Sequence, residues 1–181
     1  MKKVILYMCM LFMFTGCTKD EKRERTLSEN QYYLVAADGE KLLVTLPEEF
    51  SSKEQEKEVS VLKAYFQQNA TKLLTLYYFK ESEEYSADDI LKKLKHFSKE
   101  YEQLVFFNDG EIVSKTEKKE LEAGSMKGYY SEVTYVLDGN ESFCAEFYLK
   151  KDEYVLNVTL RLDGEDARHI RIDEIAKDLI Q

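Results

Sequence analysis

The sequence predicts an α+β fold, in which a central antiparallel sheet built from hairpins and a meander packs with two main helices. Short segments rich in β-branched and aromatic residues recur along the chain, and turn residues, including several Asp-Gly steps, separate them. Two other segments, 86–104 and 172–180, instead place apolar residues at helical spacing. Short turns join consecutive strands into hairpins, whose strands run antiparallel.

Two hairpins are expected in the first part of the chain. Segments 32–37 and 41–46 flank an Asp-Gly step, which is a strong hairpin signal between apolar runs. Residues 48–58 are polar, which indicates a loop or a short exposed helix. Segments 59–66 and 73–79 form the second hairpin. The latter is apolar on both faces, which predicts a central strand covered on both sides.

A helix is expected to begin at Ser86. This residue suits the N-cap, and Asp88 and Asp89 follow in the first turn, where the helix dipole favours negative charge. The apolar stripe of the helix consists of Ile90, Leu94, Phe97, Tyr101 and Leu104. Most of the lysines lie off this stripe: Lys92, Lys93, Lys95 and Lys99. We interpret them as a solvated helix face, with a binding surface as the alternative.

The rest of the chain is predicted to contain a meander and a closing helix. Asn108-Asp109-Gly110 forms a turn between Phe106-Phe107 and Ile112-Val113, and the polar stretch 115–127 carries no clear pattern. Three alternating strands then follow, at 129–137, 143–149 and 154–162. The closing helix has apolar residues at helical spacing: Ile172, Ile175, Ala176, Leu179 and Ile180.

The first residues resemble a bacterial lipoprotein signal. Met1-Lys2-Lys3 is basic, residues 4–14 are apolar, and Thr15-Gly16-Cys17 resembles the lipobox. In that family the peptide is cut before the cysteine, the sulfur takes a diacylglycerol, and the new amine is acylated, so Cys17 is the expected lipidation site and should take up palmitate. The apolar run is shorter than the roughly 20 residues of a transmembrane helix. An uncleaved anchor starting at Val4 is the alternative.

Three segments are therefore expected. Residues 1–16 are the signal peptide, residues 17–30 are the lipidated cysteine with a flexible charged tether, and residues 31–181 are a single α+β domain. The lipid would hold the domain at the cell membrane or the outer membrane, outside the cytoplasm. Lys19-Asp20-Glu21 resembles the surface-export signals of Bacteroidetes lipoproteins, and a Gram-positive lipoprotein is the alternative.

Charge and cysteine content restrict the partners. The formal charge is −9, and it becomes −11 when Lys2 and Lys3 leave with the signal peptide. Such a chain repels phosphate backbones, so no nucleic-acid partner is expected, and adhesion to anionic lipid through charge is disfavoured. Cys9 leaves with the signal peptide and Cys17 is lipidated, so Cys144 has no disulfide partner and should pack like a small hydrophobe.

No catalytic or metal-binding signature is present in the sequence. His96 and His169 are the only histidines, and neither has a second histidine at metal-ligand spacing. The Asp-Gly steps lack the register of a calcium loop, and Ser60-Val61-Leu62-Lys63 matches S-x-x-K on a predicted strand rather than on the helix that this motif requires. We therefore expect no catalytic residue, no metal, no cofactor and no enzymatic activity.

One face of the meander is a candidate for binding. Opposite its aliphatic stripe we expect tyrosines, acids and an arginine on rigid strands, and Tyr and Arg are frequent anchors at interfaces. The candidate partner-binding residues are Tyr130, Glu132, Glu146, Tyr148 and Arg161. An ordinary solvated or helix-covered sheet surface is the alternative.

The order of elements resembles the PsbP/DcrB-like fold. The strand at Lys41 to Pro47, followed by the strand containing Lys63-Ala64-Tyr65-Phe66, completes the order of two hairpins, a helix, antiparallel strands and a closing helix. The resemblance implies an α/β/α sandwich over residues 31–180 and a non-catalytic accessory role. The expected function is a cell-envelope lipoprotein that binds a protein partner in the envelope or outside the cell. The alternatives are an immunity or inhibitor lipoprotein and a small-ligand sensor.

Overall fold

The structure is a computed structural model that describes residues 26–82, 86–164 and 170–180. Its elements are β1 (Gln31–Val35), β2 (Lys41–Thr45), β3 (Phe50–Ser52), β4 (Glu58–Val59), β5 (Val61–Phe66), β6 (Leu73–Lys80), α2 (Ala87–Phe107), β7 (Glu111–Ala123), β8 (Met126–Leu137), β9 (Asn140–Lys151), β10 (Tyr154–Asp163) and α3 (Ile172–Leu179). The strands form a seven-stranded sheet, ordered β3-β5-β6-β10-β9-β8-β7, and a three-stranded sheet, ordered β2-β1-β4. The larger sheet is antiparallel throughout, as the sequence predicts.

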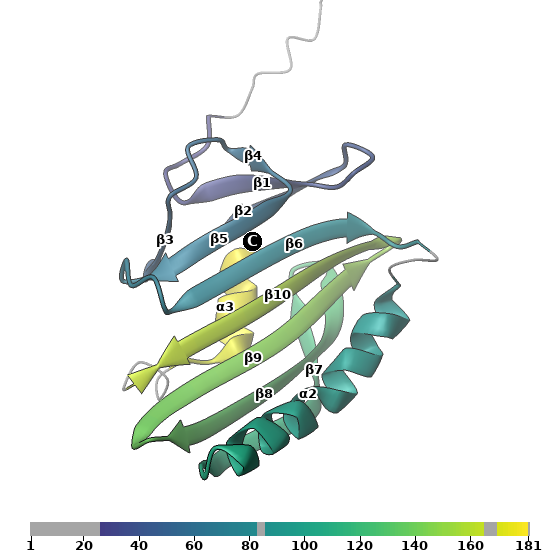
Figure 1. Cartoon of the computed structure of the whole chain (residues 1–181). Coiled ribbons are helices and arrows are strands. Elements are labelled where there is room, and N and C mark those ends of the chain that lie inside the picture. Colours follow the sequence, from purple (N-terminus) through teal and green to yellow (C-terminus); the bar gives the residue numbers. More distant parts are fainter. Residues whose placement is uncertain (1–25, 83–85, 165–169, 181) are drawn as a thin grey trace, which may run out of the picture.

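The large sheet separates two layers of covering elements. Helix α2 lies along one face, against β7, β8 and β9, whereas α3 and the small sheet pack on the other face (Figure 1). We call these the α2 face and the α3 face. The expected α+β architecture with two main helices is therefore present, and the small sheet adds to the layer that contains α3.

The main core lies on the α3 face. Because side chains alternate along a strand, every second residue of β6, β9 and β10 points to this face. The small sheet adds Leu34 and Val44 to this core, and α3 adds Ile172, Ala176 and Leu179. Away from the strand ends, the inward residues of the three large-sheet strands are buried: Leu74, Leu76, Tyr78, Phe143, Ala145, Phe147, Leu149, Leu156, Val158, Leu160 and Leu162.

Helix α2 starts at the predicted cap and packs through most of the predicted stripe. Ser86 Oγ accepts a hydrogen bond from the Asp89 N–H at 3.2 Å. The buried helix residues are Ala87, Ile90, Leu94, Phe97 and Val105. Leu104 was expected in this stripe but is 45% exposed; Val105, one position later, is buried in its place. The hydroxyl of Ser131 on β8, which is fully buried, lies 2.9 Å from the Leu94 carbonyl.

Several strand expectations need correction. The unassigned stretch 115–127 belongs mainly to β7, so the meander runs from β7 to β10. Segment 48–58 contains the short strand β3 and the first residue of β4. Its polar residues conceal them, because β3 and β4 are too short to show an alternating pattern. Phe106 and Phe107 are the last residues of α2, and the turn expected after them is present at Asn108 and Asp109.

Strand β6 is central, as predicted, but it is not covered on both sides. It lies between β5 and β10, and its Leu74, Leu76 and Tyr78 point into the main core. On the α2 face only Phe79 is buried, beneath the start of α2, whereas Tyr77 is 38% exposed. The remainder of this face lies beyond the reach of the helix.

The two edges of the large sheet are protected against further strand pairing. Strand β7 shifts register between Ile112 and Ser114 and again between Thr116 and Lys119. It also carries exposed lysines, and bulges and lysines both hinder edge-to-edge association. At the other edge, β3 has only three residues. A partner is therefore more easily accommodated on a face of this sheet than at an edge.

Gly128 allows a close approach of β8 to β9. A Cβ at this position would overlap the backbone carbonyl of Tyr148. We predict that Gly128→Ala lowers the free energy of unfolding by about 2–4 kcal/mol, because backbone rather than a mobile side chain must move. Chemical denaturation measures this loss. As a control, Gly139→Asn should cost less than about 1 kcal/mol, since Asn tolerates a left-handed turn and nothing lies within 4 Å of a Cβ there. Equal stability of the two variants would contradict the prediction.

Candidate functional site

The register of the meander divides the predicted binding patch between the two sheet faces. Residues directly opposite each other on paired strands share a face. Tyr130 lies opposite Phe147, and Glu132 opposite Ala145, which places both on the α3 face. Glu146 lies on the other face.

Tyr148 and Arg161 also lie on the α2 face, because Tyr148 opposes Asn157 and Arg161 opposes Cys144. The prediction that the five residues share one surface is therefore wrong. Both faces of β8 carry apolar residues, because both are covered. The alternation within this strand therefore cannot predict which of its residues lie on the α2 face and which on the α3 face.

The two tyrosines proposed as anchors are buried. Tyr130 belongs to the main core, and Lys119 Nζ lies 5.9 Å from the centre of its ring. Tyr148 packs beneath the start of α2 with Ile90. Glu132 is half-buried and accepts a hydrogen bond from Thr116 Oγ1 at 3.2 Å. These three residues stabilise the sheet and its covering layers. A partner could reach the ring of Tyr130 or Tyr148 only by displacing the layer that covers it.

An uncovered area is present on the α2 face, over β5, β6 and β10. Its residues, which we call the open face, are Val61, Lys63, Tyr65, Leu73, Thr75, Tyr77, Asn157, Thr159 and Arg161. All of them are half-buried or exposed, with Val61 and Tyr77 at 39% and 38%. Of the predicted residues, only Arg161 belongs to the open face.

The side chains of the open face form rows across the strands. Lys63, Thr75 and Thr159 make a polar row that continues to Glu146 on β9. Tyr77 lies between Val61 and Asn157 in the next row, and Leu73 lies between Tyr65 and Arg161 in the row on the other side. The sequence signal for this face is the pair Lys63 and Thr75, which are polar residues within otherwise apolar strands.

Cations outnumber accessible carboxylates on the open face. Lys63 and Arg161 are exposed, and Lys53 Nζ lies 5.2 Å from the centre of the Tyr65 ring. Asp163 Oδ1 is 3.8 Å from Arg161 Nε, a distance that leaves the guanidinium available to other acceptors. On a chain of net charge −9, this arrangement favours contact with negatively charged groups.

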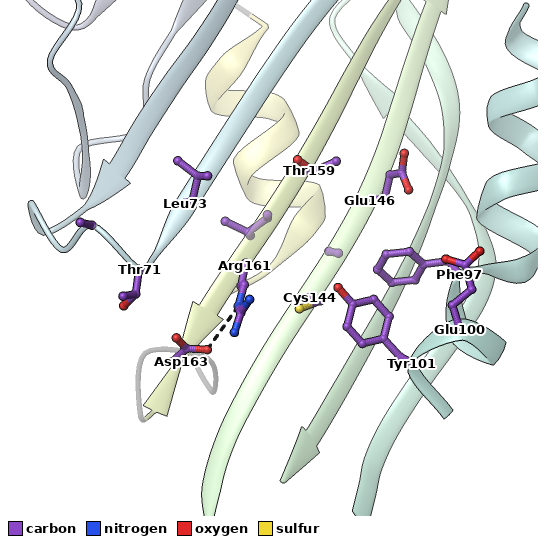
Figure 2. A pocket seen from close by; sticks show the side chains of 13 residues that line it. Thr71, Leu73, Phe97, Glu100, Tyr101, Cys144, Glu146, Thr159, Arg161 and Asp163 are labelled. Carbon is purple, nitrogen blue, oxygen red and sulfur yellow. Dashed lines mark ion pairs between the residues drawn. The ribbon is translucent and has the colours of Figure 1, made fainter. Parts of the chain in front are cut away.

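A trough separates the open face from α2 (Figure 2). Its volume is about 630 Å³. It is lined by Ala70, Thr71, Leu73, Phe97, Glu100, Tyr101, Cys144, Ala145, Glu146, Thr159, Leu160, Arg161 and Asp163. The trough therefore joins two of the predicted residues, Glu146 and Arg161, with an apolar wall from the helix. Its size and mixed lining fit a side chain of a partner or a small ligand.

The carboxyl group of Glu146 has a raised pKa in the trough. Burial raises its pKa above the ordinary value and the nearby Glu100 adds to this, while the hydrogen bond from Asn157 Nδ2 at 3.2 Å and the charge of Lys93 oppose it. A carboxyl group in this setting holds a proton more readily than a solvated one, and it can also accept a hydrogen bond from an amine or amide.

The thiol of Cys144 is packed rather than reactive. Cys144 is buried, and burial raises its pKa, with Tyr101 and Tyr135 beside it opposing the change. Figure 2 shows Tyr101 reaching from α2 toward Cys144. A buried thiol with a raised pKa is a poor nucleophile. The expectation that Cys144 packs like a small hydrophobe is confirmed.

The described residues include only part of the other features singled out in the sequence. His96 is exposed on α2, whereas His169 and Cys17 lie outside the described part of the chain. Within residues 26–82, 86–164 and 170–180, no group of three or more His, Cys, Asp or Glu side chains could hold a metal. None of the helices in those ranges is long and apolar enough to span a bilayer.

Comparisons with known proteins identify similarities of fold only. No family model and no curated protein matches the chain. A crystal structure from Bacteroides thetaiotaomicron is similar over 76% of this chain, with a TM-score of 0.42 and 10% identity; the chain spans 42% of that protein. The solution structure of cyanobacterial PsbP (CyanoP) from Synechocystis is similar over 78% of this chain and 85% of its own, with a TM-score of 0.38 and 10% identity. At this level neither similarity assigns a function.

The raised pKa of Glu146 predicts a pH-dependent effect of Glu146→Gln on stability. The folded state binds the proton more tightly than the unfolded state, so the wild type loses stability as pH rises from about 4 through the raised pKa. The variant does not lose this stability, because glutamine stays neutral and its side-chain oxygen can still accept the hydrogen bond from Asn157. Its stability relative to wild type should therefore increase between pH 4 and pH 7 in denaturation curves. Glu54→Gln, in an exposed loop, is the control; parallel pH profiles for Glu146→Gln and wild type would refute the prediction.

Proposed function

We propose that this protein is a lipid-anchored protein of the cell envelope that binds a protein partner through the open face, without catalysis. The observation that carries the proposal is the uncovered half of the large sheet, where aromatic, hydroxyl and cationic side chains project from rigid strands. The partner surface that fits it has acidic side chains opposite Lys63 and Arg161 and apolar side chains opposite Val61 and Tyr77.

The physical basis of this fit is the combination of burial and charge. Tyr77 stacks on Phe79 with ring centroids 5.2 Å apart, which holds its ring in place before any partner arrives. A preformed aromatic anchor loses little conformational entropy on binding. The neighbouring cations would speed encounter with an acidic partner and set its orientation. An immunity or inhibitor role would use the same surface, whereas a small-ligand sensor would use the trough.

The proposed anchor agrees with the sequence at the amino terminus. Thr15-Gly16-Cys17 resembles a lipobox, and a tether from Cys17 to the start of the described chain would reach roughly 30 Å when extended. Two or more acyl chains give stable membrane attachment, whereas one does not. The domain would then remain near the membrane with freedom to turn its open face toward a partner.

Lipidation makes a direct prediction for Cys17. Cells that produce the wild-type protein in the presence of radiolabelled palmitate should label it, and Cys17→Ser should abolish the label and move the protein to the soluble fraction, because no thioether can form. Cys144→Ala, which changes the buried thiol instead, should keep both label and membrane fraction. An unlabelled wild-type protein would eliminate the anchor.

The open face makes a second prediction. A photo-crosslinking residue at Thr159 should capture a partner in intact cells, and the partner can then be identified and purified. Lys63→Glu combined with Arg161→Glu should weaken its binding at least tenfold, because both exposed cations are reversed. The melting temperature should change little, since neither side chain is buried.

The matched control is Lys118→Glu combined with Lys151→Glu, which makes the same change in net charge on exposed residues elsewhere. If both double variants bind the purified partner equally well, the open face is not the binding surface.

A further inference from the structure

Two adjacent phenylalanines are exposed at the end of α2. The exposed fractions of Phe106 and Phe107 are 75% and 79%, and their rings contact each other with centroids 5.8 Å apart. Leu104 and Val113, at 45% and 57%, lie close to them in sequence. Large aromatic side chains carry roughly 150–250 Å² of mostly apolar surface each, so this pair presents an apolar patch comparable to the largest patch of a typical monomer, which is often functional.

Cations precede these rings along the outer side of the helix. Lys92, Lys95, Lys99, Gln103, Phe106 and Phe107 recur at intervals of three and four residues, apart from the adjacent phenylalanine pair, and so lie on one side of α2. All six are exposed. We call this set the α2 ridge. A shallow hollow of about 480 Å³ lies among Lys99, Glu102, Gln103, Phe106 and Phe107.

The charge of the ridge is positive where it approaches the rings. Lys92 is 3.2 Å from Asp89, but no described residue forms an ion pair with Lys95 or Lys99. Glu102 is engaged by Lys115 from β7, which also holds Glu117 at 3.5 Å. Glu102, the acid that lines the hollow, is thus already paired, and Lys99 is available beside the exposed rings.

We infer that the α2 ridge is a docking site for a protein partner that offers an apolar pocket with an acidic rim. The pocket would take Phe106 and Phe107, and the rim would meet Lys95 and Lys99. A second copy of this chain fits poorly, because a symmetric contact would bring the same lysines together. A lipid surface is a different occupant, and an adduct with phospholipid in the experiment below would identify it.

The position of the ridge supports a partner away from the anchor. The described chain begins at residue 26 beside the small sheet, whereas the end of α2 lies at the opposite end of the molecule (Figure 1). A tether that leaves near the small sheet therefore does not hold the phenylalanines against the same membrane. This site goes beyond the open face, since it is built on the helix rather than on the sheet.

Photo-crosslinking in intact cells tests the inference with the full chain. The crosslinker replaces Gln103 on the ridge and, in separate strains, Thr159 on the open face and Lys151 at the exposed end of β9. We expect Gln103 to give an adduct with a protein that Lys151 does not give. The captured protein is then identified, purified and titrated against detergent-solubilised variants.

The variants separate the aromatic from the charged contribution. Phe106→Ser with Phe107→Ser should weaken binding at least tenfold, and Lys95→Glu with Lys99→Glu should weaken it several-fold and reduce its dependence on salt. The control is again Lys118→Glu with Lys151→Glu. All changed side chains are exposed, so unchanged melting temperatures show that folding is intact.

Four outcomes would overturn the inference: no adduct at Gln103, an adduct with a second copy, an adduct with phospholipid, or unchanged affinity of the purified partner for the Phe106→Ser, Phe107→Ser variant. The adduct at Thr159 reports on the open face alone. Failure of the ridge and failure of the proposed function can therefore be told apart.

Discussion

The width of one helix limits how much of the large sheet can be covered. A helix with its side chains is about 10–12 Å across, whereas adjacent strands are about 4.8 Å apart, so α2 spans only two or three strands. It packs over β7, β8 and β9, and it leaves β5 and most of β6 and β10 uncovered on that face. On the other face, α3 and the small sheet together cover the large sheet and bury the main core. The open face and the trough both follow from this unequal covering.

The uncovered surfaces share a chemical pattern. On the open face, Lys63 and Arg161 flank apolar and aromatic side chains; on the α2 ridge, Lys95 and Lys99 precede two phenylalanines. Both depart from the acidic character of the chain, whose net charge is −9. Exposed apolar groups are easily desolvated when they form the centre of an interface. The cations beside them favour a partner with negative charge. This pattern is the basis of both proposals.

Local signals predicted the elements well where they act over a few residues. The cap at Ser86, the Asp-Gly turn before β2 and the apolar residues of α3 are all present as expected. Predictions failed where a contact between distant segments decides the result. Leu104 has the right spacing for the stripe, but the helix turns Val105 toward β8 instead. The candidate patch failed because both faces of β8 are covered, so its pattern gives no indication of orientation.

The sequence by itself determined the order of both helices and most of the strands, the alternation within those strands, the acidic charge and the lipobox-like segment before the domain, because these depend on neighbouring residues. Only the tertiary structure decided which side chains remain accessible. The side chains of Tyr148 and Tyr77 both lie on the α2 face of the large sheet. Tyr148 is buried under α2, whereas Tyr77 lies beyond the helix and is exposed. The physical reason is that exposure depends on where a separate element packs, and no local pattern of residues contains that information.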